Sequence, residues 1–316
     1  MKRIVFLGQG VEYVFSDLAK QTIASGFDVT EIDMLNSRWL DAMNAVEREN
    51  FILVTSHHPY LGAEDYIKFH RIPAPVISIP EFIQTYRPSK SYYVPHDLVY
   101  PYKDDEIPAL KYFDALLMPN DRFWYLNRFV PVISIGWIKL KPAMERGTPR
   151  YPIALIPSEI PRLLRLPPNE IASLLGPILD RRPIVLLPKF GEIERLANFA
   201  RSRGSEVAPW GTSTPSVISN AQFVITNGMS SIIAEAVVHG KPVVCLADGV
   251  FSLEEQKERL GDLPGVFFGD AEAGLAWVDS LASNPALYKG VSPGTDVTPF
   301  DTARFMEILS GQLGGA

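Results

Sequence analysis

A glycine, two serines and a glutamate with helical spacing are the first residues that point to chemistry. Ser231 and Glu235 are four residues apart, so both side chains lie on one face at the start of a predicted helix. A helix N-terminus offers unpaired N–H groups and a partial positive charge. Gly228, Ser230 and Ser231 are therefore expected to bind a diphosphate, and Glu235 to accept hydrogen bonds from ribose hydroxyls. The structural alternative is that Ser230 caps the helix and Glu235 is solvated.

A β-α-β unit is expected to position these groups. Residues 223–226 and 243–246 are short runs rich in β-branched and aromatic residues, and a helical pattern lies between them. Both runs lack alternating polar positions, as strands do that are buried on two faces of a parallel sheet. Gly240 is expected to end the helix in a left-handed conformation, and Pro242 prevents its continuation.

The segment 219–246 also resembles a known family segment. It contains the run FVITNGMSSIIAEAVVHGKPVVCL, which is similar to the donor-binding segment of GT-B glycosyltransferases. The nearest group is that of CDP-glycerol glycerophosphotransferases and capsule polysaccharide transferases, and non-hydrolysing UDP-N-acetylglucosamine 2-epimerases have a similar segment. Asn227 stands where these families usually have aspartate, and it is expected at the donor site. The resemblance implies an α/β, GT-B fold with two Rossmann-like domains facing a cleft.

Composition excludes several other classes of protein. A chain of 316 residues is long enough for two domains, since domains usually have about 100–200 residues. The net charge of −6 argues against a nucleic-acid binder, which normally carries a basic stripe. Cys245 is the only cysteine and lies in an apolar run, so neither a disulfide framework nor a cysteine zinc cluster is expected.

The N-terminal apolar run, residues 4–7, is shorter than the roughly 7–15 residues of a signal-peptide core. No window approaches the roughly 20 apolar residues of a membrane span. We therefore expect a soluble cytoplasmic protein, with the inner face of the membrane as the alternative placement.

The chain opens with a strand, a glycine loop and a helix, as Rossmann-like domains do. Gly8 and Gly10 flank the loop. A dinucleotide site would need a third glycine at the position of Tyr13, although Asp33 sits where a ribose-binding acid would. Gly8 and Gly10 are instead expected at the cleft, where the backbone approaches a ligand closely.

Two adjacent histidines, His57 and His58, follow the predicted strand 51–55. Adjacent side chains point in different directions, so the pair is a poor metal clamp without a third ligand. Ligands of open parallel sheets bind at the carboxyl ends of strands. His57 and His58 are thus either acceptor contacts in the cleft or ordinary polar loop residues.

A third histidine follows the predicted strand 91–94. His96 resembles the histidine of a His-Gly pair that glycerophosphotransferases carry at the end of an N-domain strand, where it is the proposed catalytic base; Asp97 replaces the glycine. An imidazole with a pKa near 6.5 can take the proton of an acceptor hydroxyl at neutral pH. Asp97 is expected to orient or charge that ring. The alternative is that His96 has a structural role and only makes hydrogen bonds within its own loop.

Three further residues of the second half are candidates. Ser158 follows the predicted strand 153–156 and is expected to face the cleft. Lys189 lies where glycerophosphotransferases have a Lys-His-Pro segment; the histidine is absent, and the lysine is expected to contact a donor phosphate. Trp210 lies where GT-B proteins hold the nucleobase, so it either stacks on a base or is an ordinary core aromatic.

The predicted domains are an N-terminal acceptor domain (1–140), a C-terminal nucleotide-donor domain (150–297) and a last helix (298–316) that crosses back to the first domain in many GT-B folds. Residues 108–118 are expected to form a helix, and residues 252–260 a solvated charged helix.

The resemblance implies a metal-independent transferase without a cofactor. A nucleotide-activated sugar or polyol phosphate would be the donor, and a surface polysaccharide or other glycan the acceptor. The helix start, with Lys189, would replace the metal ion in stabilising the departing phosphate. The alternatives are a UDP-sugar 2-epimerase and a non-catalytic nucleotide-binding assembly subunit. Peripheral association with a membrane or a partner protein is a further option.

Overall fold

A computed structural model describes most of the chain: residues 3–8, 11–62, 74–96, 102, 104–140, 148–158, 163–187, 193–228, 230–247, 253–260, 265–284, 286–287 and 297–311. The chain divides into two compact units. Unit 1 comprises Met1–His96, Tyr102–Leu140 and Asp296–Ala316, and unit 2 comprises Asp97–Pro101 and Lys141–Thr295. Among the described residues, no helix combines the length and apolar character that a membrane crossing requires.

Unit 1 is built on a six-stranded parallel sheet with the order β2-β1-β3-β6-β7-β8. A separate antiparallel pair, β4 and β5, lies beside it. The elements are β1 (Arg3–Gly8), α1 (Val11–Ala24), β2 (Val29–Asp33), α2 (Trp39–Asn44), β3 (Phe51–Thr55), β4 (Tyr60–Gly62), β5 (Val76–Ser78), α4 (Ile79–Tyr86), β6 (Lys90–Tyr93), α5 (Ile107–Leu110), β7 (Ala115–Met118), the 3₁₀ helix η1 (Asp121–Arg128), β8 (Val132–Ser134) and α14 (Thr302–Ser310).

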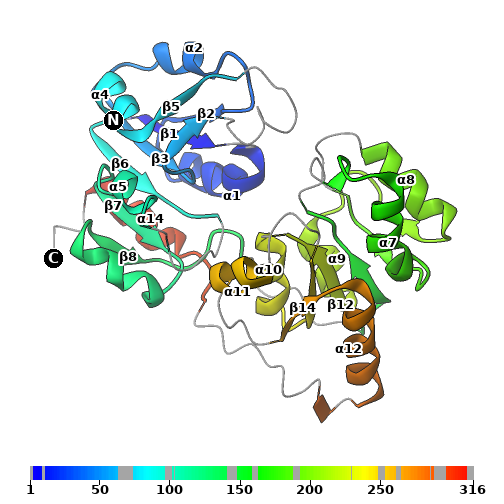
Figure 1. The fold of residues 1–316 in the computed structure, drawn as a ribbon. Coiled ribbons are helices and arrows are strands. Elements are labelled where there is room, and N and C mark those ends of the chain that lie inside the picture. Colours follow the sequence, from blue (N-terminus) through cyan, green and yellow to red (C-terminus); the bar gives the residue numbers. More distant parts are fainter. Residues whose placement is uncertain are drawn as a thin grey trace. The chain divides into compact units, whose positions relative to one another are not determined.

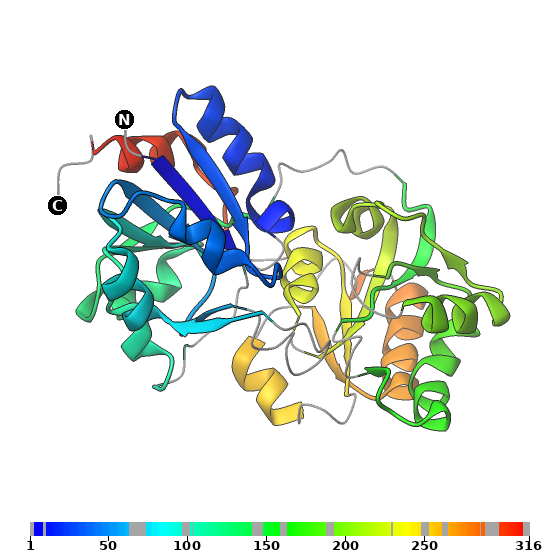
Figure 2. The same ribbon diagram turned by 90° about the horizontal axis from the view of Figure 1, so that it is seen from above.

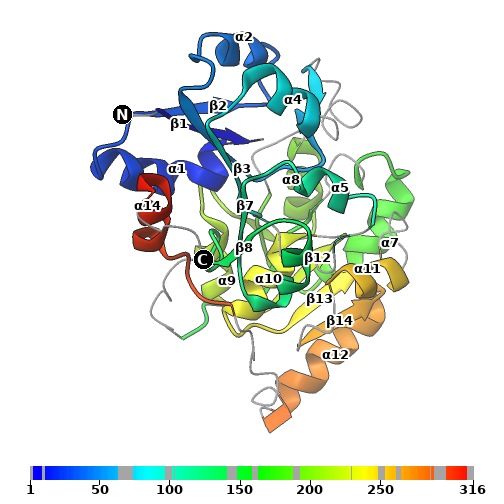
Figure 3. The same cartoon turned by 90° about the vertical axis from the view of Figure 1, so that its left-hand side faces the viewer.

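One face of the unit 1 sheet is covered by the first and the last helix of the chain. Phe15 of α1 and Phe305 of α14 are fully buried against Phe6 of β1, with ring centroids 5.2 and 6.4 Å from that ring. The two helices lie side by side (Figure 3). The last helix is therefore part of the core of unit 1.

A glycine fixes the entry of the C-terminal segment into unit 1. Gly136 has φ +87°, and a Cβ there would meet the Pro299 carbonyl oxygen at 2.2 Å. Trp137 N–H donates to the Thr298 carbonyl at 2.9 Å, and Asp301 N–H donates to the Ile135 carbonyl at 2.7 Å. The close approach of the two backbones therefore requires a residue without a side chain.

We expect Gly136→Ala to destabilise the protein by about 2–5 kcal/mol. About 1–2 kcal/mol comes from the left-handed backbone, and about 1–3 kcal/mol from the clash with Pro299. Gly26→Ala is the matched control, because Gly26 has φ +90° but open space around its Cβ position. Urea unfolding measures both variants. Equal losses of unfolding free energy would contradict the proposed backbone contact.

The helix predicted for residues 108–118 is wrong. Only Ile107–Leu110 is helical, and Ala115–Met118 is the buried strand β7. The run from Ala115 is apolar on both faces, as in any central parallel strand, so periodicity alone does not separate it from a buried helix.

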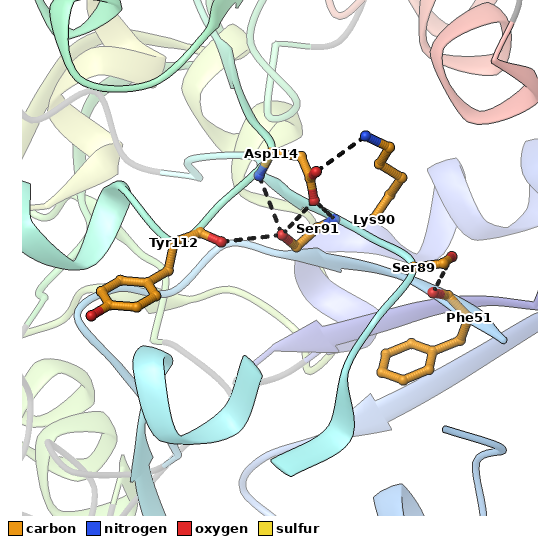
Figure 4. A network of polar contacts seen from close by, with 6 residues as sticks. All are labelled: Phe51, Ser89, Lys90, Ser91, Tyr112 and Asp114. Carbon is orange, nitrogen blue, oxygen red and sulfur yellow. Dashed lines mark hydrogen bonds and ion pairs between the residues drawn. The ribbon is translucent and has the colours of Figure 1, made fainter. Parts of the chain in front are cut away.

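Asp114, the residue before β7, is hydrogen-bonded through its side chain to the neighbouring strand β6. Its carboxylate accepts from the Ser91 N–H at 2.8 Å and the Ser91 hydroxyl at 3.0 Å, and Lys90 lies 3.2 Å away (Figure 4). Burial and, secondarily, this carboxylate raise the pKa of the Tyr92 hydroxyl above its ordinary value of 10.0. Tyr92 therefore stays neutral at physiological pH.

Unit 2 has a second six-stranded parallel sheet, with the order β11-β10-β9-β12-β13-β14. This is the strand order of dinucleotide-binding Rossmann domains. The elements are β9 (Tyr151–Leu155), α7 (Pro168–Leu179), β10 (Ile184–Val185), α8 (Ile193–Ser202), β11 (Glu206–Val207), α9 (Thr214–Ser219), β12 (Ala221–Asn227), α10 (Ser231–Val238), β13 (Val243–Leu246), α11 (Leu253–Leu260), β14 (Val266–Gly269) and α12 (Ala271–Ser283).

Helices cover both faces of this sheet. Helices α7, α8 and α12 pack on one face, where Leu175, Leu196 and Leu275 are buried. Helices α9 and α10 pack on the other, where Ile218 and Ile233 are fully buried (Figures 1 and 2). The sequence pattern did not reveal α7 or α12.

Helix α11 exposes Leu253, Glu254 and Lys257 to solvent, as its charge predicted. One of its described side chains is an exception. Gln256 is fully buried, and its amide N–H₂ donates to the Leu246 carbonyl at 3.4 Å. One face of this charged helix therefore packs at the end of β13.

Candidate active site

In each sheet the strand order reverses at one point. In open parallel sheets ligands bind outside the carboxyl ends of the strands, at the point where the strand order reverses. That point lies between β1 and β3 in unit 1 and between β9 and β12 in unit 2. Gly8 ends β1 and His57 follows β3, while Ser158 follows β9 and Gly228 follows β12. These four predicted residues therefore lie at the two reversal points.

The turn between β12 and α10 begins with a left-handed glycine and ends with a capping serine. Gly228 has φ +69°, a conformation that favours glycine, and its carbonyl accepts from the Cys245 thiol at 3.3 Å. Ser230 is extended, and its hydroxyl accepts from the Ile232 N–H at 3.2 Å. Ser230 thus caps α10, and the partly buried Ser231 is the first residue of that helix.

Glu235 lies one helical turn further along α10 and is only 4% exposed. The alternative that it is a solvated helix residue is therefore wrong. A buried carboxylate is tolerated only where hydrogen bonds or cations compensate its lost hydration. Glu235 therefore belongs to the packed interior of unit 2.

Asn227 joins the two strand ends at the reversal point. Its side-chain oxygen accepts from the Ser158 N–H at 2.9 Å, and the Ser158 hydroxyl donates to the Asn227 carbonyl. Asn227 itself is 1% exposed. An amide oxygen accepts this bond as a carboxylate would. Asn227 and Ser158 therefore hold the loops after β9 and β12 together.

We expect Asn227→Ala to lower the free energy of unfolding by about 1–3 kcal/mol, because the Ser158 N–H loses its acceptor. Asn227→Asp keeps an acceptor oxygen and should retain most of the stability. Urea unfolding of the two variants measures the difference. An aspartate variant as unstable as the alanine variant would contradict this role of the oxygen.

In unit 1, His57 and His96 lie beside each other although they are far apart in the sequence. Their ring centroids are 5.4 Å apart, with the planes inclined by 33°. The His57 Nδ1 atom lies 3.1 Å from the Ser56 hydroxyl. Trp137, which is fully buried, donates its ring N–H to the His96 carbonyl at 3.2 Å. A hydroxyl thus contacts the His57 imidazole, and Trp137 holds the backbone that carries the His96 ring.

Gly8 lies at the same edge. A Cβ on Gly8 would make only ordinary contacts, at 3.5 Å from the Phe15 ring and 3.7 Å from the Ser56 hydroxyl. Unit 1 itself therefore tolerates a side chain there, and a requirement for glycine would have to come from a ligand. Ser56, a polar residue at the end of a buried strand, was a sequence signal for this site, whereas the contact from Trp137 had none.

Trp210 is 69% exposed, so the alternative that it belongs to the core is wrong. An exposed indole in unit 2 is compatible with base stacking. Gly10, Asp97 and Lys189 lie outside the described residues. Within the described part of the chain, no three His, Cys, Asp or Glu side chains are close enough together to hold a metal ion.

No protein-family model matches this chain, and no curated protein sequence is detectably similar. Solved structures do resemble it. The wall teichoic acid polymerase TagF superposes with a TM-score of 0.57 at 11% identity, over 99% of this chain and 90% of that one. The chain has the GT-B fold.

Two other structures agree with that fold. MurG of Acinetobacter baumannii gives a TM-score of 0.53 at 10% identity, covering 98% of this chain and 99% of that one. A protein from Listeria monocytogenes assigned as a UDP-N-acetylglucosamine 2-epimerase gives 0.56 at 12% identity, covering 99% and 96%. At these identities the likeness establishes architecture, and function has to be argued from the site.

Proposed function

We propose that this protein is a glycosyltransferase, or a polyol-phosphate transferase, of GT-B type. Unit 2 binds a nucleotide-activated donor, and unit 1 binds a surface-polysaccharide or other glycan acceptor. The observation that carries the proposal is the turn between β12 and α10. There Gly228 in a left-handed conformation, the capped helix start at Ser230 and the buried Glu235 follow one another at the reversal point of a Rossmann sheet.

The donor side follows from helix electrostatics. The N–H groups at the start of α10, with the Ser231 hydroxyl, donate to the diphosphate. Glu235 accepts from the ribose hydroxyls, and Trp210 stacks on the base. When the bond to the transferred group breaks, the electron pair stays on the nucleotide phosphate. The positive helix end and Lys189 stabilise that charge, which is the basis for a metal-independent reaction without a cofactor.

The acceptor side requires a base. The oxygen of the acceptor hydroxyl forms the new bond to the sugar carbon, or to phosphorus in a polyol-phosphate transfer. As that bond forms, the hydroxyl proton passes to His96. Asp97 orients the ring. Support for the polyol-phosphate form comes from TagF, of which a histidine-to-asparagine variant was soaked with CDPG.

A second function shares the donor site. The Listeria monocytogenes neighbour, with a TM-score of 0.56, favours a UDP-sugar 2-epimerase. An epimerase needs no acceptor, so the two functions differ in their products.

Product analysis tests the proposal. The protein is incubated with UDP-N-acetylglucosamine, UDP-glucose, GDP-mannose and CDP-glycerol, each with and without a glycan acceptor. A transferase releases nucleotide and labels the acceptor. A 2-epimer formed without an acceptor would instead establish the epimerase, and no product from any donor would favour the non-catalytic nucleotide-binding subunit. Co-sedimentation of the protein with membranes tests the further expectation of peripheral membrane association.

A further inference from the structure

The ring of His58 packs between two tyrosine rings and is separate from the pair formed by the His57 and His96 rings. Its ring is edge-on to Tyr93, the last residue of β6, at a centroid distance of 5.0 Å, and edge-on to Tyr102 at 4.9 Å. The His58 Nδ1 atom lies 2.8 Å from the Tyr93 hydroxyl. Only 14% of the His58 side chain is exposed. The His58 ring is therefore fixed by two aromatic contacts and one hydrogen bond.

The hydrogen-bonded groups continue beyond His58. The Tyr93 and Tyr102 hydroxyls are 3.1 Å apart, and the Tyr102 N–H donates to the Tyr125 hydroxyl at 2.9 Å. On the other side of the ring, Glu106 Oε1 lies 3.9 Å from His58 Nε2. We call these five residues the histidine–tyrosine network. It connects the loop after β3 with β6, with the segment before α5 and with η1.

The contacts of His58 restrain the orientation of its ring. Its Nδ1 atom shares a hydrogen bond with the Tyr93 hydroxyl, in which either group can be the donor, because an imidazole nitrogen donates in one tautomer and accepts in the other. The Tyr93 hydroxyl is also hydrogen-bonded to the Tyr102 hydroxyl. Together with the two edge-on ring contacts, these bonds hold the imidazole plane in one orientation.

His57 is joined to this network through the backbone. Its N–H donates to the Thr55 hydroxyl at 3.3 Å, and its ring faces His96 at 5.4 Å. Because His57 and His58 are consecutive, the orientation of one ring restrains the peptide that carries the other. We propose that His58 is a positioning residue, which acts through that peptide to hold His57 beside His96. This inference rests on the proposed function, in which His96 is the base.

Tyr93→Phe tests the proposal with the loss of a single hydroxyl. Tyr92→Phe is the matched control, since Tyr92 is the preceding residue of β6 and packs on the opposite face, in the core with α1 and α14. Nuclear magnetic resonance of ¹⁵N-histidine protein resolves the five imidazoles, with signals assigned through His57→Gln, His58→Gln and His96→Gln. We expect Tyr93→Phe to shift the signals of all three residues and Tyr92→Phe to shift none. A change confined to His58 would overturn the proposal.

Turnover supplies the second readout. Tyr93→Phe should lower kcat about 10- to 100-fold, because about 1 Å of misplacement of a catalytic group costs about 100-fold. Stabilisation by CDP or UDP should stay unchanged, since the nucleotide site lies in unit 2. Glu106→Gln, which keeps an acceptor oxygen, should retain more turnover than Glu106→Ala. Full turnover in Tyr93→Phe would overturn the functional part of the inference.

The two readouts separate the two hypotheses. If no nucleotide binds, the proposed function fails, and the imidazole signals still decide whether His58 positions His57. If nucleotide binds but the His57 and His96 signals do not shift in Tyr93→Phe, only the positioning inference fails.

Discussion

Glu235→Ala should abolish most of the stabilisation that the donor nucleotide gives to the protein. At about 100 times its dissociation constant a nucleotide adds about 2.7 kcal/mol to the free energy of unfolding. Two hydrogen bonds from ribose to a carboxylate, at about 1.5–3 kcal/mol each, account for at least about 100-fold in affinity. At the same concentration the variant should therefore gain only about 0.4 kcal/mol.

The comparison uses the increment that the nucleotide adds, because removing a buried carboxylate also changes the stability of the free protein. Glu206→Ala is the control, because this exposed glutamate starts β11, which is an outermost strand of the same sheet. Thermal melts with and without nucleotide measure the increments. An unchanged increment in Glu235→Ala would show that the ribose is bound elsewhere.

His96→Ala should lower turnover about 100-fold or more while the affinity for the donor stays the same. In the proposed function the base acts on the acceptor hydroxyl in unit 1, whereas the nucleotide binds to unit 2. The loop should survive the substitution, because Trp137 donates to the carbonyl of His96 and not to its ring.

The control is His239→Ala, which removes an imidazole at the far end of α10. Initial rates of nucleotide release in the presence of acceptor measure kcat, and melts measure donor binding. Normal turnover in His96→Ala would show that another group acts as the base. If wild-type protein binds nucleotide but has no turnover either, the non-catalytic subunit becomes the better description.

Local signals in the sequence were sufficient to predict the strands and the helix start that carry the proposed donor residues. The run 243–246 is the strand β13, and Ser230 occupies the cap position of α10. These features depend on residues within one turn of each other, so spacing and residue type predict them. The left-handed conformation of Gly228 belongs to the same local category.

Long-range features were beyond such signals. The four apolar residues of β7 were read as a helix, because a strand buried on both faces shows no alternation. The packing of His58 depends on Tyr93 and Tyr102, which are 35 and 44 residues further along the chain. The burial of Glu235 likewise depends on the assembled sheet. The order of the strands, which locates both reversal points, is also a long-range property.

The most direct test of a nucleotide donor site in unit 2 is a thermal-shift series on the intact protein. The ligands are CMP, CDP, UDP, GDP and ADP with their sugar or glycerol conjugates. We predict that one nucleotide and its conjugates stabilise the protein, by about 2.7 kcal/mol at about 100 times the dissociation constant, and that the base of that nucleotide identifies the donor. No stabilisation by any of them at millimolar concentration would contradict the donor site and the transferase built on it.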